Sequence, residues 1–174
     1  IGGFEIYLSR PELGKHLWET IFEAGRSENI RPGSPNIIDR VEAGLLSYGN
    51  EMTVENTPLE CNMDKFVDIN KEVDYIGKKV LLRQIKYGVK RRIRGAIYEG
   101  PELPTISTPL QVFDTDKRTI VGSLTSGAFS PHFKSNIGLG MIGYGCWDNN
   151  KEIFVKISDQ EFRKGLIKDL PLIQ

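Results

Sequence analysis

The first residues of the sequence place a carboxylate and an aromatic ring two positions apart. Residues 1–7 read Ile-Gly-Gly-Phe-Glu-Ile-Tyr, and this alternation predicts a short strand with Glu5 and Tyr7 on one face. A fixed carboxylate can accept two parallel hydrogen bonds from the N–H edge of a flat heterocycle, while a neighbouring ring supplies an apolar wall. The two side chains are therefore candidates for binding a heterocycle. The structural alternative is an edge strand with a solvated glutamate.

The composition limits the class of protein. The chain has 174 residues, with 23 Lys and Arg against 23 Asp and Glu, so its formal net charge is zero. This balance argues against a general nucleic-acid binder or a polybasic membrane anchor. No apolar run approaches the roughly 20 residues that a membrane-spanning helix needs. We expect a globular cytoplasmic protein that has no membrane or nucleic-acid partner.

Cysteines and histidines give no sign of a metal site. Cys61 and Cys146 lie far apart and fit no CxxC spacing, so we expect reduced thiols that pack as small hydrophobic side chains. His16 and His132 are isolated in the sequence. The sequence therefore predicts no bound metal.

The first part of the chain has mixed helical and extended patterns. A helix is expected over Pro11–Gly25, which has proline in its first turn and glycine at its end. Ser34 is a suitable N-cap for a second helix that continues to about Leu46. Thr57–Asp68 has an extended pattern, and Ile76–Lys86 is expected to form a short basic helix.

The second part of the chain is rich in predicted strands. Short runs of β-branched and aromatic residues alternate with Gly, Pro, Asn and Asp clusters, which is typical of a small antiparallel barrel or sandwich. Glu161–Asp169 is interpreted as a closing strand, joined to the preceding strand by a hairpin turn at residues 158–160. The other expected strands are Arg92–Tyr98, Leu110–Asp114, Thr119–Leu124, Ile137–Ile142 and Glu152–Ile157.

Several motifs occur together in a recognisable order. In register, they resemble the C-terminal half of the glycine-cleavage T-protein (aminomethyltransferase) family. The motifs are Gly3–Tyr7, Arg40–Leu46 with Tyr48–Met52, Thr57–Glu60, Asp74–Lys78, and Gly122–Gly127 with Ser130-Pro131 and Asn136–Gly140.

The resemblance implies an α+β fold and a tetrahydrofolate-dependent one-carbon transferase. Residues 1–88 would form part of a ferredoxin-like T-protein central lobe, and residues 89–174 a small antiparallel, jelly-roll-like β-barrel lobe. Glu5 would hold the pteridine edge with Tyr7 beside it, and Arg40 and Ser126 complete the expected cofactor-binding set. Ser126 belongs to a Thr125–Pro131 segment that would form a loop toward the central cavity, unless it is an ordinary hairpin.

One departure from the family pattern bears on the substrate. Aminomethyltransferases usually have an arginine where this chain has Asn36. Details such as Phe4–Tyr7 and Arg31–Asn36 look closer to dimethylsulfoniopropionate demethylases, which move a methyl group from a sulfonium to tetrahydrofolate. The expected partner is then a small-molecule sulfonium methyl donor. The alternatives are the aminomethyl-lipoyl carrier protein of glycine cleavage and a non-catalytic folate-binding scaffold, and self-association as a homodimer stays open.

The resemblance also indicates what this sequence lacks. The family's chain is about twice as long, and its catalytic aspartate lies in the half that has no counterpart here. We therefore expect the chain to be the C-terminal part of a longer protein, and no catalytic residue is assigned to it.

A basic run has two readings. Lys86, Lys90, Arg91, Arg92 and Arg94 could form a patch for nucleic acid or a polyglutamate tail. The zero net charge and the apolar residues interleaved at strand spacing favour a solvated face instead.

Overall fold

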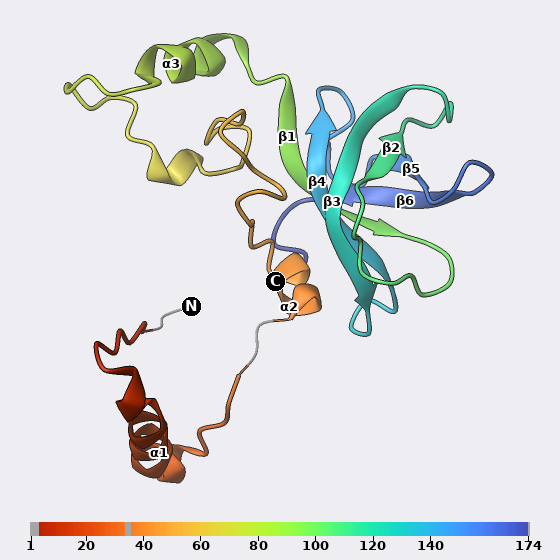
Figure 1. Cartoon of the computed structure of the whole chain (residues 1–174). Coiled ribbons are helices and arrows are strands. Elements are labelled where there is room, and N and C mark those ends of the chain that lie inside the picture. The colour runs from red at the N-terminus through yellow and green to blue at the C-terminus, as the bar shows by residue number, and fades with distance from the viewer. Residues whose placement is uncertain (1–3, 34–35, 174) are drawn as a thin grey trace. The chain divides into compact units, whose positions relative to one another are not determined.

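The computed structural model describes residues 4–33 and 36–173, which belong to two units, Ile1–Ser34 and Pro35–Gln174. In the first unit, the short 3-10 turn η1 (Pro11–Leu13) leads into α1 (Gly14–Ala24), and η2 (Arg26–Glu28) follows (Figure 1). Proline suits the start because the first helical turn needs no N–H donor there. The helix ends at Gly25, whose N–H donates to the Ile21 carbonyl at 2.9 Å. The predicted helix over Pro11–Gly25 is confirmed.

The strand predicted at the start of the chain is absent from its described part. Residues 4–8 have no regular structure, and residues 1–3 of this prediction lie outside the described residues. A strand is stabilised by hydrogen bonds to a neighbouring strand, and no described segment pairs with residues 4–8. Alternation alone therefore gave the wrong element.

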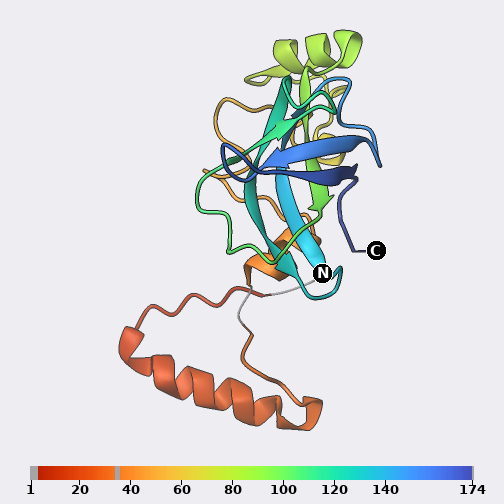
Figure 2. The same cartoon turned by 90° about the vertical axis from the view of Figure 1, so that its right-hand side faces the viewer.

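A closed antiparallel barrel dominates the second unit (Figures 1 and 2). Its strand order is β1-β4-β3-β2-β5-β6, and β6 closes the barrel by pairing with β1. The predicted barrel and closing strand are confirmed, as is the hairpin between β5 and β6. The strands are β1 (Arg91–Tyr98), β2 (Leu110–Phe113), β3 (Ile120–Ser130), β4 (Ser135–Gly143), β5 (Glu152–Lys156) and β6 (Phe162–Lys168).

Aliphatic side chains and glycines determine how closely the barrel strands approach. Val112, Leu124 and Ile153 are fully buried inside the barrel. Gly140 permits β4 to approach β3, because a Cβ there would lie 1.9 Å from the Ser123 carbonyl oxygen. The strand pattern is therefore a consequence of packing as well as of β-propensity.

The second helix is shorter than the sequence predicted. α2 covers Ile37–Glu42 and ends before Gly44, whose φ of +67° no helix can accommodate. The predicted N-cap Ser34 lies outside the described residues; in the described part, Asn36 caps the helix. α2 packs on the end of the barrel formed by β3 and β4 (Figure 1), where Val41 lies against Ile137 of β4.

The segment between α2 and the barrel is mostly turns. The prediction that Thr57–Asp68 is extended is wrong, since this segment contains turns and the short η3 (Asp64–Phe66). The basic helix is confirmed as α3 (Lys78–Tyr87), which buries Leu81. The boundary expected at residue 88 stays a prediction.

Neither a membrane-spanning helix nor a metal-binding cluster occurs in residues 4–33 and 36–173. None of their helices is long and apolar enough to cross a membrane. No group of three or more His, Cys, Asp or Glu side chains among them could hold a metal ion.

Candidate functional site

Glu5 and Tyr7 form a local pair in the first unit. The Tyr7 hydroxyl donates a hydrogen bond of 2.5 Å to Glu5 Oε2, and both residues are exposed. This bond is the main cause that raises the pKa of Tyr7 above its usual value. The other carboxylate oxygen, Oε1, receives no hydrogen bond from the described residues. The pair thus presents a carboxylate edge beside a ring, although not on a strand.

Arg40 and Ser126 meet in the second unit, far apart in sequence but adjacent in space. Arg40 Nη2 donates to Ser126 Oγ at 2.5 Å, which joins the end of α2 to β3. Arg40 also forms a two-pronged ion pair with Glu51, with Nη1–Oε2 at 2.9 Å and Nη2–Oε1 at 3.3 Å. We call Arg40, Glu51 and Ser126 the Arg40 cluster.

Glu51 is the centre of this cluster. Its side chain is 0% exposed, and Oε2 also accepts the Ser47 backbone N–H at 2.8 Å. Burial raises the pKa of Glu51, but the hydrogen bonds from Arg40 and Ser47 and the charge of Arg40 outweigh it. The pKa therefore lies below its ordinary value, and the carboxylate is ionised at neutral pH.

The cluster holds its own charges in place. Arg40 Nη1 also donates to the Leu45 carbonyl at 2.9 Å, so the guanidinium is committed to three partners within the second unit. In chemical terms, this is a rigid, internally neutralised pair that ties a turn to the barrel. Sequence reasoning missed Glu51 as the partner. The available signal was an acidic side chain in a glycine turn directly after the Arg-Val-Glu-Ala-Gly motif.

The segment containing Ser126 differs from the expected loop. The expectation of a Thr125–Pro131 loop is wrong, because residues 125–130 continue β3 and the turn comes after Ser130. A register shift between Leu124 and Ser126 reorients the strand at this point. Ser130 is buried and donates a hydrogen bond of 2.5 Å to Glu42 Oε1. Both serines thus connect β3 to the α2 segment.

Asn36 has a structural role at the start of α2. Its Oδ1 accepts the Asp39 N–H at 2.8 Å, and its Nδ2 donates to Asp39 Oδ2 at 2.8 Å. This is an N-cap arrangement that satisfies one of the free N–H groups at the start of α2. Asn36 supplies no cation.

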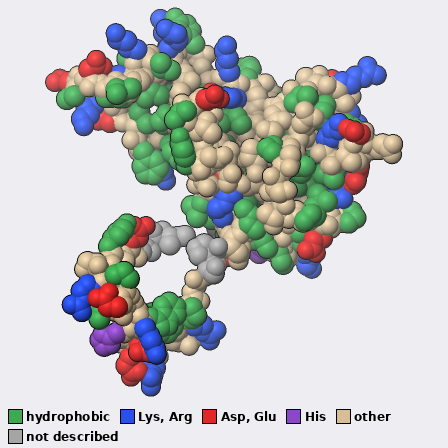
Figure 3. Space-filling model, in the orientation of Figure 1, with side chains coloured by type: hydrophobic (Ala, Val, Ile, Leu, Met, Phe, Trp, Pro, Cys, Tyr) green, Lys and Arg blue, Asp and Glu red, His purple; other side chains and the backbone are tan. Residues whose placement is uncertain are grey.

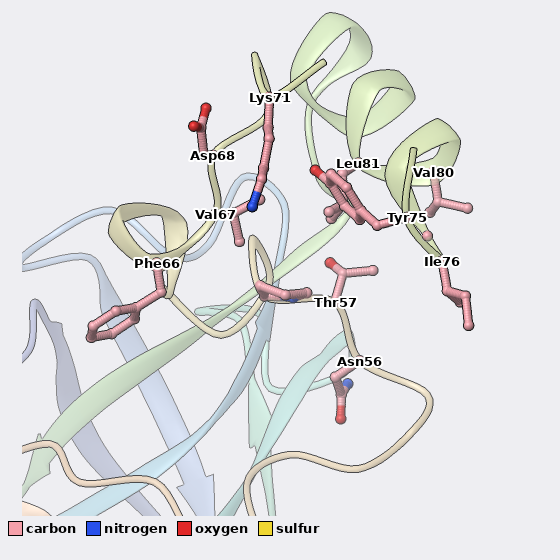
Figure 4. A pocket seen from close by; sticks show the side chains of 12 residues that line it. Asn56, Thr57, Phe66, Val67, Asp68, Lys71, Tyr75, Ile76, Val80 and Leu81 are labelled. Atoms are coloured by element: carbon pink, nitrogen blue, oxygen red, sulfur yellow. The ribbon is translucent and has the colours of Figure 1, made fainter. Parts of the chain in front are cut away.

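Two of the motif segments line one pocket. A space of about 630 Å³ is lined by Thr57 and Pro58, by Tyr75, Ile76 and Gly77, and by Leu81 of α3. Figure 4 shows the side chains of Thr57, Tyr75 and Leu81 among those around it. The lining is mainly apolar. The Tyr75 hydroxyl is buried and has no hydrogen-bond partner among the described residues.

Family models match most of the chain. The model described as "GCVT N-terminal domain" matches residues 2–71, and "Glycine cleavage T-protein C-terminal barrel domain" matches residues 91–171. The second match coincides with the six-stranded barrel.

Curated relatives have two kinds of name. Dimethylsulfoniopropionate demethylase DmdA from Ruegeria pomeroyi is 46% identical over 146 residues, which are 84% of this chain and 39% of the relative. An aminomethyltransferase from Caldanaerobacter subterraneus subsp. tengcongensis is 39% identical over 158 residues, which are 88% of this chain and 41% of the relative. This chain thus spans about two fifths of the length of these relatives.

One solved structure has a similar fold. The glycine cleavage system aminomethyltransferase T from Bartonella henselae superposes with a TM-score of 0.67 at 24% identity, over 77% of this chain and 37% of the other. At that identity, the match supports the fold alone.

Proposed function

Because the chain belongs to the glycine-cleavage T-protein family, we propose that it is the folate-side part of a tetrahydrofolate-dependent methyltransferase. The proposed reaction moves a methyl group from dimethylsulfoniopropionate to tetrahydrofolate. The observation that carries this choice is the 46% identity to a dimethylsulfoniopropionate demethylase, against 39% for an aminomethyltransferase.

Asn36 supports the same choice. An arginine at this position would add a cation at the start of α2, and a cation would repel a positively charged sulfonium substrate. Asn36 removes that repulsion while it still caps α2 through Asp39. A sulfonium sulfur is already a good leaving group, so the protein need mainly align the methyl group with its acceptor.

Glu5 and Tyr7 are proposed to contact the folate. The free Oε1 of Glu5 and the exposed Tyr7 ring fit a flat heterocycle with an N–H edge. The hydroxyl of Tyr7 holds the carboxylate in place through its bond to Oε2. When bound, tetrahydrofolate supplies the nitrogen that accepts the methyl group.

Arg40 and Ser126, which both belong to the second unit, are proposed to act mainly as positioning residues. Arg40 is already paired with Glu51, so its charge is largely neutralised before any ligand binds. The cluster fixes the turn after α2 against β3, and this rigidity would keep the wall of a ligand site in one arrangement.

The substrate can be tested by methyl transfer. The parent protein is incubated with tetrahydrofolate and either dimethylsulfoniopropionate or an aminomethyl-lipoyl carrier protein, and the folate products are measured by mass spectrometry. We expect 5-methyltetrahydrofolate with the sulfonium donor alone. Turnover of only the lipoyl carrier would establish the aminomethyltransferase alternative. Relatives named aminomethyltransferase, at 33–39% identity, are the reason for testing it. Folate binding without either product would instead indicate the scaffold.

The role of Glu5 can be tested separately. Glu5→Gln in the parent protein should weaken tetrahydrofolate binding by about 5- to 150-fold, the scale for loss of a charge-assisted hydrogen bond. Glu28→Gln is a matched control, since Glu28 is also exposed in the first unit. Titration calorimetry that gives equal affinities for both variants would remove Glu5 from the site.

A further inference from the structure

A second pocket lies where the end of α3, the start of β1 and the segment after β4 come together. Its volume is about 840 Å³, which is within the usual range for small-molecule sites of roughly 300–1,000 Å³. It lies wholly within the second unit. Its chemistry is set by cationic and aromatic side chains, chiefly Arg83, Tyr87, Lys90, Arg92, Tyr144 and Trp147.

The pocket is strongly cationic although the chain is neutral overall. Glu60 is the carboxylate in the lining, and its Oε1 already pairs with Arg91 Nε at 3.1 Å. Arg83, Lys90 and Arg92 have no carboxylate partner within 4.0 Å among the described residues. Figure 3 shows Lys and Arg side chains gathered along the part of the surface that carries α3. Three positive charges therefore face a ligand-sized space without compensation.

The three arginines of β1 do not form the solvated face that the sequence favoured. Arg91, Arg92 and Arg94 are all partly buried. Arg94 is committed elsewhere, since its Nη1 lies 3.5 Å from Asp169 and its Nε donates to the Trp147 carbonyl at 2.7 Å. In β1, Arg91 and Arg94 thus form ion pairs within the protein, whereas Arg92 lines the pocket without one in the described part of the chain.

The aromatic side chains give the pocket open ring surfaces. Trp147 has the Arg92 guanidinium 5.6 Å from its ring centre, and Tyr144 packs edge-on against Trp147 at 5.2 Å. Tyr87 and Tyr144 are 73% and 79% exposed. Lys86 Nζ lies 5.1 Å from the centre of the Tyr87 ring, so Tyr144 offers the more open ring to a flat ligand, whereas Trp147 fixes the direction of Arg92.

Arg92 also has a polar atom without a partner. Its Nε is buried and donates to no hydrogen-bond acceptor among the described residues. Unsatisfied buried donors are uncommon in proteins and are costly where they occur. An acceptor bound beside the Arg92 guanidinium in the pocket would compensate its charge.

We propose that this pocket binds a small ligand that joins a flat ring to two or more negative charges. Arginine binds phosphate and carboxylate groups in a two-pronged geometry, and lysine adds a point charge. The ring would stack on Tyr144, which is 79% exposed. Nucleoside phosphates and aromatic polycarboxylates share this chemistry. The pocket shares no residue with the Glu5 pair or the Arg40 cluster, and the proposal rests on the pocket's own residues rather than on the proposed function.

Titration calorimetry with four probes tests the proposal. ADP and p-aminobenzoyl-triglutamate carry both a ring and several charges, pyrophosphate carries only charges, and adenosine carries only a ring. We expect at least one of the first two to bind at submillimolar concentration, at least fivefold tighter than pyrophosphate and adenosine. Which of the two binds identifies the source of the ligand. Pyrophosphate binding as tight as the ring-bearing probe that binds, or no submillimolar binding by either of the first two probes, would overturn the proposal.

Variants locate the binding in the pocket. Arg83→Ala and Lys90→Ala should each lower the affinity for the ring-bearing probe that binds by about tenfold, since each removes a charge-assisted contact. Lys79→Ala is the matched control, because Lys79 is exposed on the same helix but does not line the pocket. Tyr144→Ala should weaken the ring-bearing probe and leave pyrophosphate unchanged. Melting temperatures confirm that each variant is folded. Equal losses from the control and the pocket variants would refute this location.

Discussion

Glutamine in place of Glu51 is expected to destabilise the second unit by about 3 kcal/mol. Removal of one partner from a buried ion pair costs about 3–5 kcal/mol, because the remaining charge is left without compensation. The Glu51 side chain is 0% exposed, whereas that of Arg40 is 20% exposed. The remaining guanidinium can recover some hydration, so the cost should lie at the lower end of that range.

Urea unfolding at pH 7, followed by circular dichroism, measures this loss. With a denaturant slope of about 2 kcal/mol per molar, the midpoint should fall by about 1.5 M. Glu152→Gln is a matched control, since Glu152 pairs with Lys164 at the surface, where the side chains are 41% and 47% exposed. Its midpoint should hardly move. Arg40→Met combined with Glu51→Gln should be less destabilised than the sum of the single changes, because the pair is then removed as a whole.

The pH dependence of stability tests whether the Arg40–Glu51 pair stabilises the fold. The pKa of Glu51 is lower in the folded than in the unfolded state, so the stability that it contributes is present above the unfolded pKa, near 4.5, and is lost as pH falls through the folded pKa. The difference between wild type and Glu51→Gln should therefore shrink from pH 7 toward pH 3. A midpoint change below about 0.3 M at pH 7, or a difference that grows at low pH, would show that the pair is not stabilising.

Three further changes test other parts of the fold. Asn36→Ala should lower the free energy of unfolding, measured in urea, by about 0.5–2 kcal/mol because the α2 cap is lost. Asn36→Ser should keep most of the wild-type stability, since serine also caps helices. Equal losses from the two variants would argue against a capping role. Gly140→Ala should cost about 3 kcal/mol or prevent folding, because its Cβ would lie 1.9 Å from the Ser123 carbonyl oxygen; a wild-type melting temperature would contradict that packing. Burial raises the pKa of Tyr98 to about 12, so its stabilising effect is full below pH 10 and is lost as pH rises toward 12. An absorbance titration should show one late-ionising phenol that is absent from Tyr98→Phe.

The barrel could be predicted because its signals are local. Runs such as Glu152–Lys156 alternate between buried and half-buried positions, and turn residues separate them from their neighbours. Gly165 complicates the last strand, but a Cβ there would lie 2.7 Å from Tyr98 Cβ, so glycine is required by the close approach of β6 to β1. These features belong to the strands themselves and to their immediate partners.

The failures came from elements that depend on distant partners. Residues 4–8 and 57–68 alternate like strands, yet no neighbouring strand among the described residues completes them. The register shift at Leu124–Ser126 and the pairing of Arg40 with Glu51 are likewise set by how separate segments pack. The family resemblance could nominate Arg40 and Ser126 but could not show that they meet each other.

The docking of α2 has a consequence for synthesis on the ribosome. A six-residue helix is unstable by itself, and α2 packs on Ile137 and Leu139, while the Glu42 carbonyl accepts the Leu172 N–H at 2.8 Å. At about 5–20 residues per second, these partners emerge on the order of ten seconds after α2 itself. The helix that precedes the barrel in the sequence must therefore wait for the strands and for residues 170–173, and it completes its contacts last.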